Sequence, residues 1–224
     1  MVDNLIDILI SVPCVLIALT FHEFAHAFVA NKLGDPTAKY LGRLTLNPIK
    51  HIDIFGAICM LLFRFGWAKS VPVDTRYFKN QRRDMALTAL AGPATNLILA
   101  ILGALLYSLF MLAVKGIAIE YKSFMYWVFY TLASILISFI WLNIALALFN
   151  LIPLPPLDGS RIFLVWLPDH LYFKVMRRER EIAMGFMIAL IVDSYLLCGI
   201  LTYGLSFLVE KVFNGIMWVF SFIY

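Results

Sequence analysis

Long apolar runs dominate the chain, and most charged positions lie between these runs. A membrane-spanning helix needs about 20 mainly apolar residues. Four runs are long enough: 8–31, 85–114, 123–157 and 182–209. The third is longer than one span, and Pro153, Pro155 and Pro156 predict where its helix ends, because proline lacks an amide donor and clashes with the preceding turn. The pattern therefore predicts an all-α polytopic membrane protein with about four transmembrane helices.

Two shorter apolar segments do not fit a span. The ten uncharged residues 54–63 are too few to cross a bilayer, and the glycines, prolines and β-prone residues around them favour a re-entrant β-hairpin or loop within 44–72. The aromatic segment 212–224 is expected to lie in the interface or to cap the bundle. The only charged residues before the first run are acidic, and no small-residue cleavage site follows the run. We therefore expect a retained span rather than a signal peptide.

Composition supports the membrane assignment. Hydrophobic residues make up 62% of the 224 positions and charged residues 14%, whereas soluble domains average about 45–50% and about 25%. These values exclude a disordered chain, a disulfide scaffold and a typical soluble enzyme. No repeat or soluble linker is evident, so residues 1–224 are expected to form a single integral-membrane domain.

Loop charges predict the orientation of the spans. Segment 32–84 carries ten Lys and Arg residues and 169–181 carries four, but only Lys115 and Lys122 separate the second and third runs. The positive-inside rule places the two basic segments in the cytosol and the N-terminus outside. The net charge of +4 is therefore attributed to membrane orientation and not to nucleic-acid binding.

The first apolar run contains the pattern H-E-x-x-H at His22, Glu23 and His26. Residues four apart share one face of a helix, so the two imidazoles can occupy adjacent positions on a tetrahedral Zn²⁺. Glu23 lies within reach of the open position, as the general base of a metalloprotease requires. The alternative is a polar cluster satisfied by neighbouring helices, although such a cluster is costly within a membrane.

A catalytic zinc site needs a third protein ligand. His51 and His170 lie in basic segments, so Asp158 is the stronger candidate. It follows the prolines that end the third apolar run, and a lone carboxylate at membrane depth needs a metal or a partner. The alternative for Asp158 is a local ion pair with Arg161.

These motifs together resemble the site-2 protease family of intramembrane zinc metalloproteases. The resemblance rests on H-E-x-x-H and on the distant N-x-x-P-x-x-P-L-D-G at 150–159. It also rests on G-W-A-K with V-P-V at 66–73, and on A-G-P with Asn96. It covers roughly residues 15–165. The chain resembles the minimal members, without a PDZ-like insert or appended regulatory domains.

The resemblance implies a three-helix catalytic core, plus one further helix, around one catalytic zinc ion near the cytosolic face. It implies zinc ligation by His22, His26 and Asp158 and a catalytic role for Glu23. Asn150 matches a family asparagine that binds the substrate backbone or the oxyanion. Asn96 is a further candidate for substrate contact, with hydrogen bonding between helices as its alternative; the same two interpretations apply to Asn143.

The implied activity is hydrolysis of peptide bonds within or near transmembrane segments of other membrane proteins. Such a substrate must unwind, because its peptide bonds are hidden in helical hydrogen bonds. Segment 44–72 is placed to offer an edge strand to it. The expected partners are a transmembrane substrate and the lipid bilayer of a prokaryotic plasma membrane, and the expected roles are regulated intramembrane proteolysis or clearance of signal-peptide remnants.

Three other interpretations stay open from the sequence: a membrane zinc protease with a Glu as third ligand, a metal transporter, and an inactive binder of membrane proteins. Asp193, within the fourth run, is a separate question. Four interpretations apply to this carboxyl group: it is protonated, it pairs with a polar group of the bundle, it gates water, or it acts in catalysis.

Overall fold

The computed structural model describes residues 2–53, 56, 69–195 and 199–223, and most of these are helical. The long helices are α1 (Val2–Lys32), α4 (Gln81–Val114), α5 (Phe124–Asn150), α8 (Glu179–Tyr195) and α9 (Ile200–Phe220). The short helices are α2 (Thr37–Tyr40), α6 (Asp158–Phe163) and α7 (Asp169–Arg177). Single 3₁₀ turns are η1 (Pro48–His51), η2 (Thr75–Tyr77), η3 (Leu164–Trp166) and η4 (Ser221–Ile223). The described residues contain no β-strand.

Four helical segments are long and apolar enough to cross a membrane: Ile10–Lys32, Gln81–Val114, Phe124–Asn150 and Leu201–Ile223. The prediction of an all-α, multi-pass membrane protein with four spans is thus confirmed. Helix α5 ends at Asn150, just before the prolines, as the sequence predicted.

The position of the fourth span is a correction. The apolar run 182–209 is two helices and not one, because α8 ends at Tyr195 and α9 begins at Ile200. Gly199, which precedes α9, has a φ of 74°, a left-handed conformation that favours glycine. The carboxylate of Asp193 accepts hydrogen bonds from the first amides of α9. The residues from 212 onward, expected to lie in the interface or to cap the bundle, instead continue the fourth span as far as Ile223.

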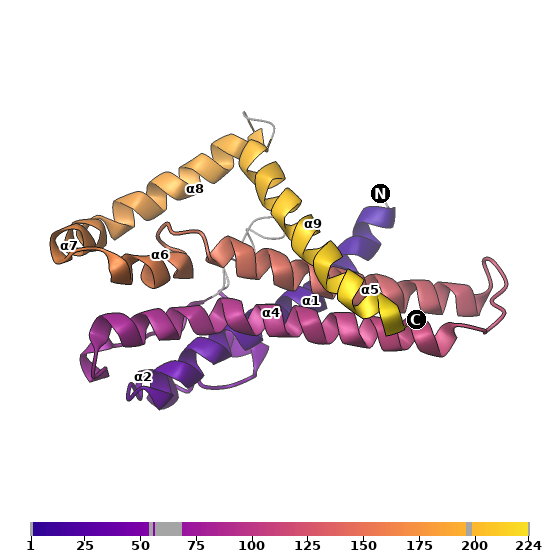
Figure 1. Ribbon diagram of the computed structural model, residues 1–224, viewed down its shortest axis with the longest axis horizontal. Helices are drawn as coiled ribbons and strands as arrows, with labels where there is room; N and C mark the ends of the chain where they lie inside the picture. The colour runs from indigo at the N-terminus through magenta and orange to yellow at the C-terminus, as the bar shows by residue number, and fades with distance from the viewer. Residues whose placement is uncertain (1, 54–55, 57–68, 196–198, 224) are drawn as a thin grey trace.

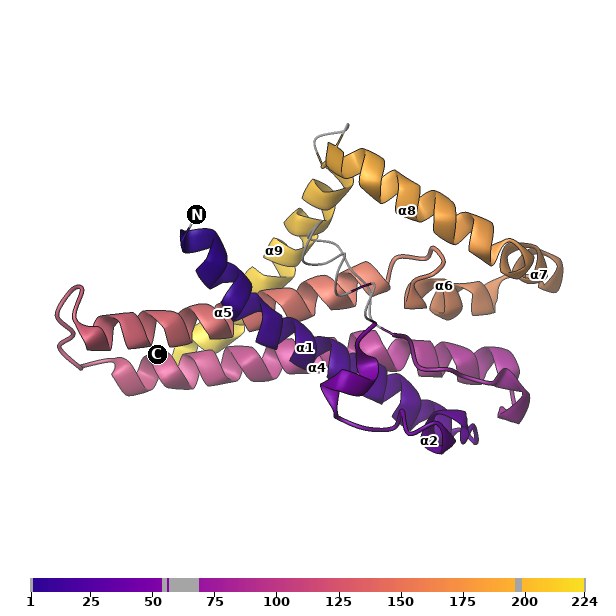
Figure 2. The ribbon, with the colours of Figure 1, turned by 180° about the vertical axis from the view of Figure 1, so that it is seen from behind.

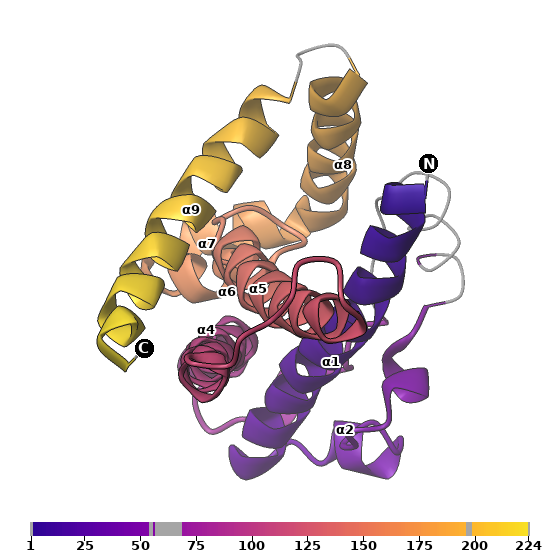
Figure 3. The same ribbon diagram turned by 90° about the vertical axis from the view of Figure 1, so that its right-hand side faces the viewer.

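Helices α1, α4 and α5 pack against one another and form the predicted three-helix core. Helices α4 and α5 run side by side along the long axis of the molecule (Figure 1), and α1 crosses them, as the reverse view shows (Figure 2). The end-on view places α9 on the side of α5 away from α1 (Figure 3). Helices α6, α7 and α8 gather at the end where α4 begins.

Small residues allow α4 and α5 to approach closely. Ala100 and Ala104 on α4 are fully buried against Ile140 and Ile144 on α5. A Cβ at Gly103 would lie 3.0 Å from the Ile140 Cγ1. Close packing of this kind drives helix association in lipid, where the hydrophobic effect between helices is absent.

Apolar side chains lie on the outside of the bundle and polar side chains on its inside, as expected for a protein in a bilayer. Large apolar side chains on α4 remain exposed on its outer face, at Ile98, Leu102, Leu106 and Leu109. Charged and polar side chains instead lie inside the bundle, among them Glu23, Asn96 and Asn143. A lipid-facing surface outside and a polar interior identify the bundle centre as the place to look for chemistry.

Arg43 joins two described parts of the chain between α1 and α4. Arg43 donates hydrogen bonds to the carbonyls of Lys69 and Ser70, at 2.5 and 3.4 Å. The predicted re-entrant hairpin or loop falls largely on 54–55 and 57–68, which lie outside the described residues.

Candidate metal centre

The residues of the H-E-x-x-H pattern lie in the second half of α1, facing α4 and α5. His22, Glu23 and His26 are buried, with exposed fractions of 5%, 7% and 8%. The two imidazole rings come from adjacent turns on one face of α1, and their centroids are 4.6 Å apart. Helical periodicity therefore places the two imidazole rings side by side, so that one metal ion could bind a nitrogen atom of each.

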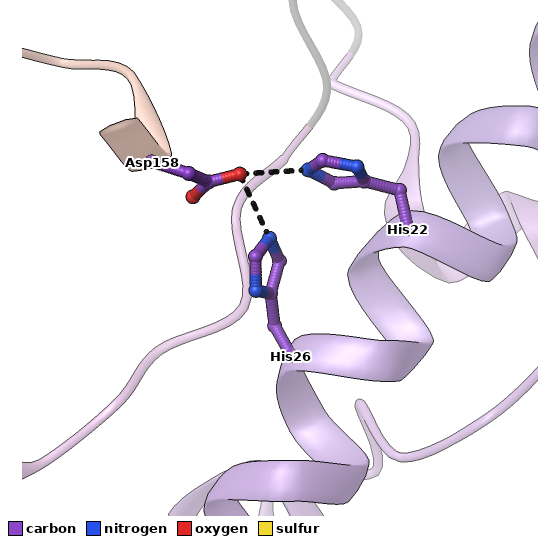
Figure 4. A group of neighbouring side chains, drawn as sticks. All are labelled: His22, His26 and Asp158. Carbon is purple, nitrogen blue, oxygen red and sulfur yellow. Dashed lines mark ion pairs between the residues drawn. The ribbon is translucent and has the colours of Figure 1, made fainter. Parts of the chain in front are cut away.

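Asp158, the first residue of α6, completes this group (Figure 4). Its Oδ2 lies 3.1 Å from the Nε2 of His22 and 3.3 Å from the Nε2 of His26. A Cβ at the next residue, Gly159, would overlap the carbonyl oxygens of Leu151 and Ile152. Glycine is therefore needed at 159 for close backbone packing, because the chain must turn back sharply after α5 to bring Asp158 to α1.

Arg161 does not neutralise Asp158. Its guanidinium forms an ion pair with Glu179 at the start of α8, so the local Asp158–Arg161 pair does not form. Burial disfavours an ionised Asp158, but the imidazoles of His22 and His26 outweigh burial and hold the pKa of its carboxyl well below the usual range. The carboxylate thus stays ionised, as a metal ligand must.

Both histidines use their other ring nitrogen to bind the protein. Nδ1 of His22 lies 2.5 Å from Oδ1 of Asn96, and Nδ1 of His26 lies 2.8 Å from the carbonyl oxygen of Thr88. Oxygen acceptors at these positions require a proton on each Nδ1, so Nε2 is the nitrogen that carries the lone pair whenever the ring is neutral. Metal-binding histidines in proteins are held in this way.

The donor atoms fit a zinc ion. Donors on a tetrahedral Zn²⁺ with bonds of about 2.0–2.1 Å are about 3.3 Å apart, and the observed Oδ2-to-Nε2 distances are 3.1 and 3.3 Å. Oδ2 of Asp158 is buried and faces both Nε2 atoms, and it accepts no well-aligned hydrogen bond within the described part of the chain. Two imidazoles and one carboxylate are also a donor set that zinc enzymes use.

Glu23 is held separately from the three ligand candidates. Its Oε2 accepts a hydrogen bond of 2.8 Å from the amide of Val71. Val71 belongs to the extended segment that Arg43 anchors through Lys69 and Ser70. This contact brings Val71, the first residue of the V-P-V pattern, to the candidate centre.

A cavity of about 210 Å³ opens beside these residues. Its wall comes from α1, α4, α6, the end of α5, the start of α8 and the segment after Lys69, and includes His22, Glu23, His26, Ser70, Val71, Val73, Thr88, Asn150, Asp158, Arg161 and Glu179. Asn150 is the last residue of α5, and its Nδ2 donates to the carbonyl of Leu146. The structure thus brings Asn150 to the same cavity as Glu23 and Asp158.

Asn96 lies behind the centre and not in the cavity wall. Its side chain is fully buried between His22 and Asn143. At this position it orients an imidazole and does not reach a molecule bound in the cavity. Hydrogen bonding between helices, the alternative interpretation, is what the structure shows for Asn96 and for Asn143.

Some contributors to the centre could not be found from the sequence. The Thr88 carbonyl and the Val71 amide are backbone groups, which no side-chain pattern marks. Gly92 carried a weak signal, because a glycine in an apolar span suggests close packing. The contact that it permits is with the two histidines: a Cβ there would lie 2.5 Å from Nε2 of His26 and 2.6 Å from Cε1 of His22.

Comparisons with known proteins point to one family of peptidases. The model of Peptidase family M50 matches residues 115–193. The chain is 41% identical to YwhC of Bacillus subtilis, a protein named as a zinc metalloprotease, over 90% of this chain and 89% of the relative.

More distant relatives carry the same kind of name. Rip2 of Mycolicibacterium smegmatis, named as a zinc metalloprotease, is 32% identical over 64% of this chain and 52% of its own length. Rip2 of Mycobacterium tuberculosis H37Rv is 30% identical over 78% of this chain and 63% of its own length. No solved structure matches the chain.

Proposed function

Because the chain belongs to peptidase family M50, whose members are zinc-dependent intramembrane proteases, we propose that it hydrolyses peptide bonds within or near transmembrane segments of other membrane proteins. As a member of this family, the chain is a zinc-dependent metalloendopeptidase, and its four candidate spans make it a multi-pass membrane protein. The observation that carries the finer proposal is the cavity inside the bundle, where the H-E-x-x-H face of α1 meets Asp158.

In this proposal His22, His26 and Asp158 hold one catalytic Zn²⁺. The convergence of their donor atoms, the burial of Oδ2 of Asp158 between the two imidazoles and the Nδ1 hydrogen bonds support the assignment. A zinc ion bound there would lower the pKa of a water molecule and polarise the scissile carbonyl.

Glu23 is the proposed general base. It lines the cavity one residue from His22, and it would take a proton from the attacking water and deliver it to the leaving amine. The Val71 amide binds Oε2 of Glu23, which holds the carboxylate in one orientation and leaves Oε1 for proton transfer.

Asn150 is the proposed donor to the substrate. Its amide lines the cavity opposite α1, and only one of its two N–H groups is needed for the bond to Leu146. The remaining N–H can bind the substrate backbone or the oxygen on which negative charge develops. Such a donor is commonly worth about 3 kcal/mol of transition-state stabilisation.

The extended residues Ser70, Val71 and Val73 are the proposed contact surface for the unwound substrate. They line the cavity beside Glu23, so a peptide paired with them would pass the catalytic centre. The earlier part of the proposed edge, 54–55 and 57–68, lies outside the described residues.

We propose a location near the cytosolic face and an N-terminus outside. The basic segment 32–84 begins where α1 ends, about two turns beyond His26. The proposed roles are regulated intramembrane proteolysis or clearance of signal-peptide remnants, with a single-span protein or peptide as substrate.

The test is cleavage of a candidate single-span substrate by the purified chain in liposomes. Zinc chelation should abolish cleavage and added zinc should restore it. Glu23→Gln should keep zinc and lower the rate by about 10²-fold or more, as removal of a general base does, whereas Asp158→Asn should lose zinc itself. Cleavage at the wild-type rate by Glu23→Gln would overturn the proposed mechanism.

A further inference from the structure

A chain of hydrogen bonds leads from His22 to the backbone of α5. Nδ1 of His22 binds Oδ1 of Asn96, at 2.5 Å. Nδ2 of Asn96 donates to Oδ1 of Asn143, at 2.8 Å, and Nδ2 of Asn143 donates to the carbonyl of Phe139, at 2.9 Å. The chain crosses α1, α4 and α5, and both asparagine residues are fully buried.

The Phe139 carbonyl sets the direction of every bond in this chain. A backbone carbonyl only accepts, so Asn143 must turn its NH₂ toward Phe139. Oδ1 of Asn143 then faces Asn96 and can only accept, which turns the NH₂ of Asn96 toward α5. The Ala18 carbonyl, 3.4 Å from the same Nδ2, favours the same orientation. Oδ1 of Asn96 is therefore left to face His22.

The orientation of Asn96 decides which nitrogen of His22 carries the proton. With Oδ1 toward the ring, Nδ1 must be the donor, so Nε2 keeps its lone pair. An Asn96 turned the other way would donate to Nδ1 and move the proton to Nε2. That nitrogen is the one that lies 3.1 Å from Asp158, and a protonated nitrogen cannot bind a metal ion.

The two histidines differ in how they are held. Nδ1 of His26 binds the Thr88 carbonyl directly, so a backbone group alone fixes its tautomer. His22 has no such carbonyl on its Nδ1 and reaches the Phe139 carbonyl only through the two asparagines. His22 is therefore the ligand candidate whose tautomer depends on side chains.

We propose that Asn143 is a positioning residue that acts through Asn96 to hold His22 in the tautomer that binds zinc. Asn143 is not among the residues that line the cavity, and its side chain forms hydrogen bonds with Asn96 and Phe139. This inference rests on the zinc ligands assigned under the proposed function.

Zinc affinity of the full chain in detergent, measured by competition with a chelator, tests the proposal. Asn143→Leu, which keeps the branched shape of the side chain and removes both hydrogen bonds, should weaken zinc binding about 10- to 100-fold, as loss of a group that orients a metal ligand does. Asn143→Asp should restore it, because a buried protonated carboxyl offers one acceptor to Asn96 and one donor to Phe139. Ser108→Ala, which removes another fully buried polar group from this bundle, should leave the affinity unchanged.

The tautomer itself provides a second measurement. In zinc-free protein at a pH where the imidazoles are neutral, ¹⁵N spectra of labelled histidine should show the His22 proton on Nδ1. In Asn143→Leu only the 3.4 Å contact with the Ala18 carbonyl still orients Asn96, so part of the population should carry the proton on Nε2; in Asn143→Asp the proton should return to Nδ1. The His22 signals are assigned by their loss in His22→Ala.

Wild-type zinc affinity in Asn143→Leu would overturn the inference. Equal weakening of zinc binding in the Leu and Asp variants would also overturn it, because the loss would then come from altered packing and not from the chain of hydrogen bonds. Asp158→Asn separates this inference from the ligand assignment. If that variant keeps zinc, the ligand set is wrong, whatever Asn143 does.

Discussion

Gly92 shows how a single residue shapes the centre without taking part in its chemistry. It lies on α4 against the imidazoles of α1, and its missing side chain leaves the space that the rings occupy. Glycine weakens a helix by about 1 kcal/mol relative to alanine. The helix tolerates this cost because no other residue lets α4 approach the two histidines.

Gly92→Ala should weaken zinc binding by about 10-fold or more, since the new methyl group would push at least one imidazole out of its orientation. The matched control is Gly103→Ala on the same helix, whose Cβ would meet Ile140 and Phe139 instead. The control should lower the unfolding temperature and keep the zinc affinity. Zinc titration of both variants checks this, and equal affinity in the two would contradict the role given to Gly92.

At the scale of elements, the break between α8 and α9 changes the meaning of Asp193. The residue is fully buried, and its carboxylate accepts bonds from the amides of Leu201 and Thr202 and from the Thr202 hydroxyl. It therefore caps the N-terminus of α9, where free amides and the helix dipole favour a negative charge.

Asp193→Ala should lower the stability of the chain by about 1 kcal/mol, the usual cost of losing a cap. Asp193→Asn should lose much less, because its amide oxygen caps nearly as well. Thermal unfolding in detergent measures the difference. Both variants should cleave at the wild-type rate below the transition, and a folded but inactive Asp193→Asn would assign this residue to catalysis instead.

At the scale of the whole molecule, the proposed zinc ligands join parts of the chain that are far apart in sequence. His22 and His26 come from α1 and Asp158 from α6, with α4 and α5 between them in the sequence. Three polar donors gathered inside an apolar bundle repel one another unless a cation or protons compensate them. Zinc is therefore expected to stabilise the fold as well as to serve catalysis.

Chelation should lower the unfolding temperature of the wild-type chain and leave Asp158→Asn unaffected. A ligand at 100 times its dissociation constant stabilises the native state by about 2.7 kcal/mol. Differential scanning fluorimetry in detergent, with and without chelator, would measure this shift. A chelator effect of the same size in Asp158→Asn would place the stabilising zinc elsewhere.

Local patterns predicted much of this protein because they depend on neighbouring residues. The apolar runs located three of the four spans, with most ends within four residues, and proline chemistry marked the end of α5. The fourth span was displaced because hydropathy cannot distinguish one long helix from two capped ones. The two helices are distinguished by the hydrogen bond between the Asp193 carboxylate and an amide eight residues later. Hydropathy averaged over a sequence window contains no information about such a bond.

By itself the sequence determined that the chain spans a membrane, that two imidazoles share a helix face, and that a carboxylate follows a proline-rich turn, because each is set by composition or helical periodicity. Only the tertiary structure decided which partners these groups take. Arg161 pairs with Glu179, Asn96 turns to His22, and the Val71 amide binds Glu23. These contacts join separate elements, and their geometry comes from helix packing that no local pattern specifies.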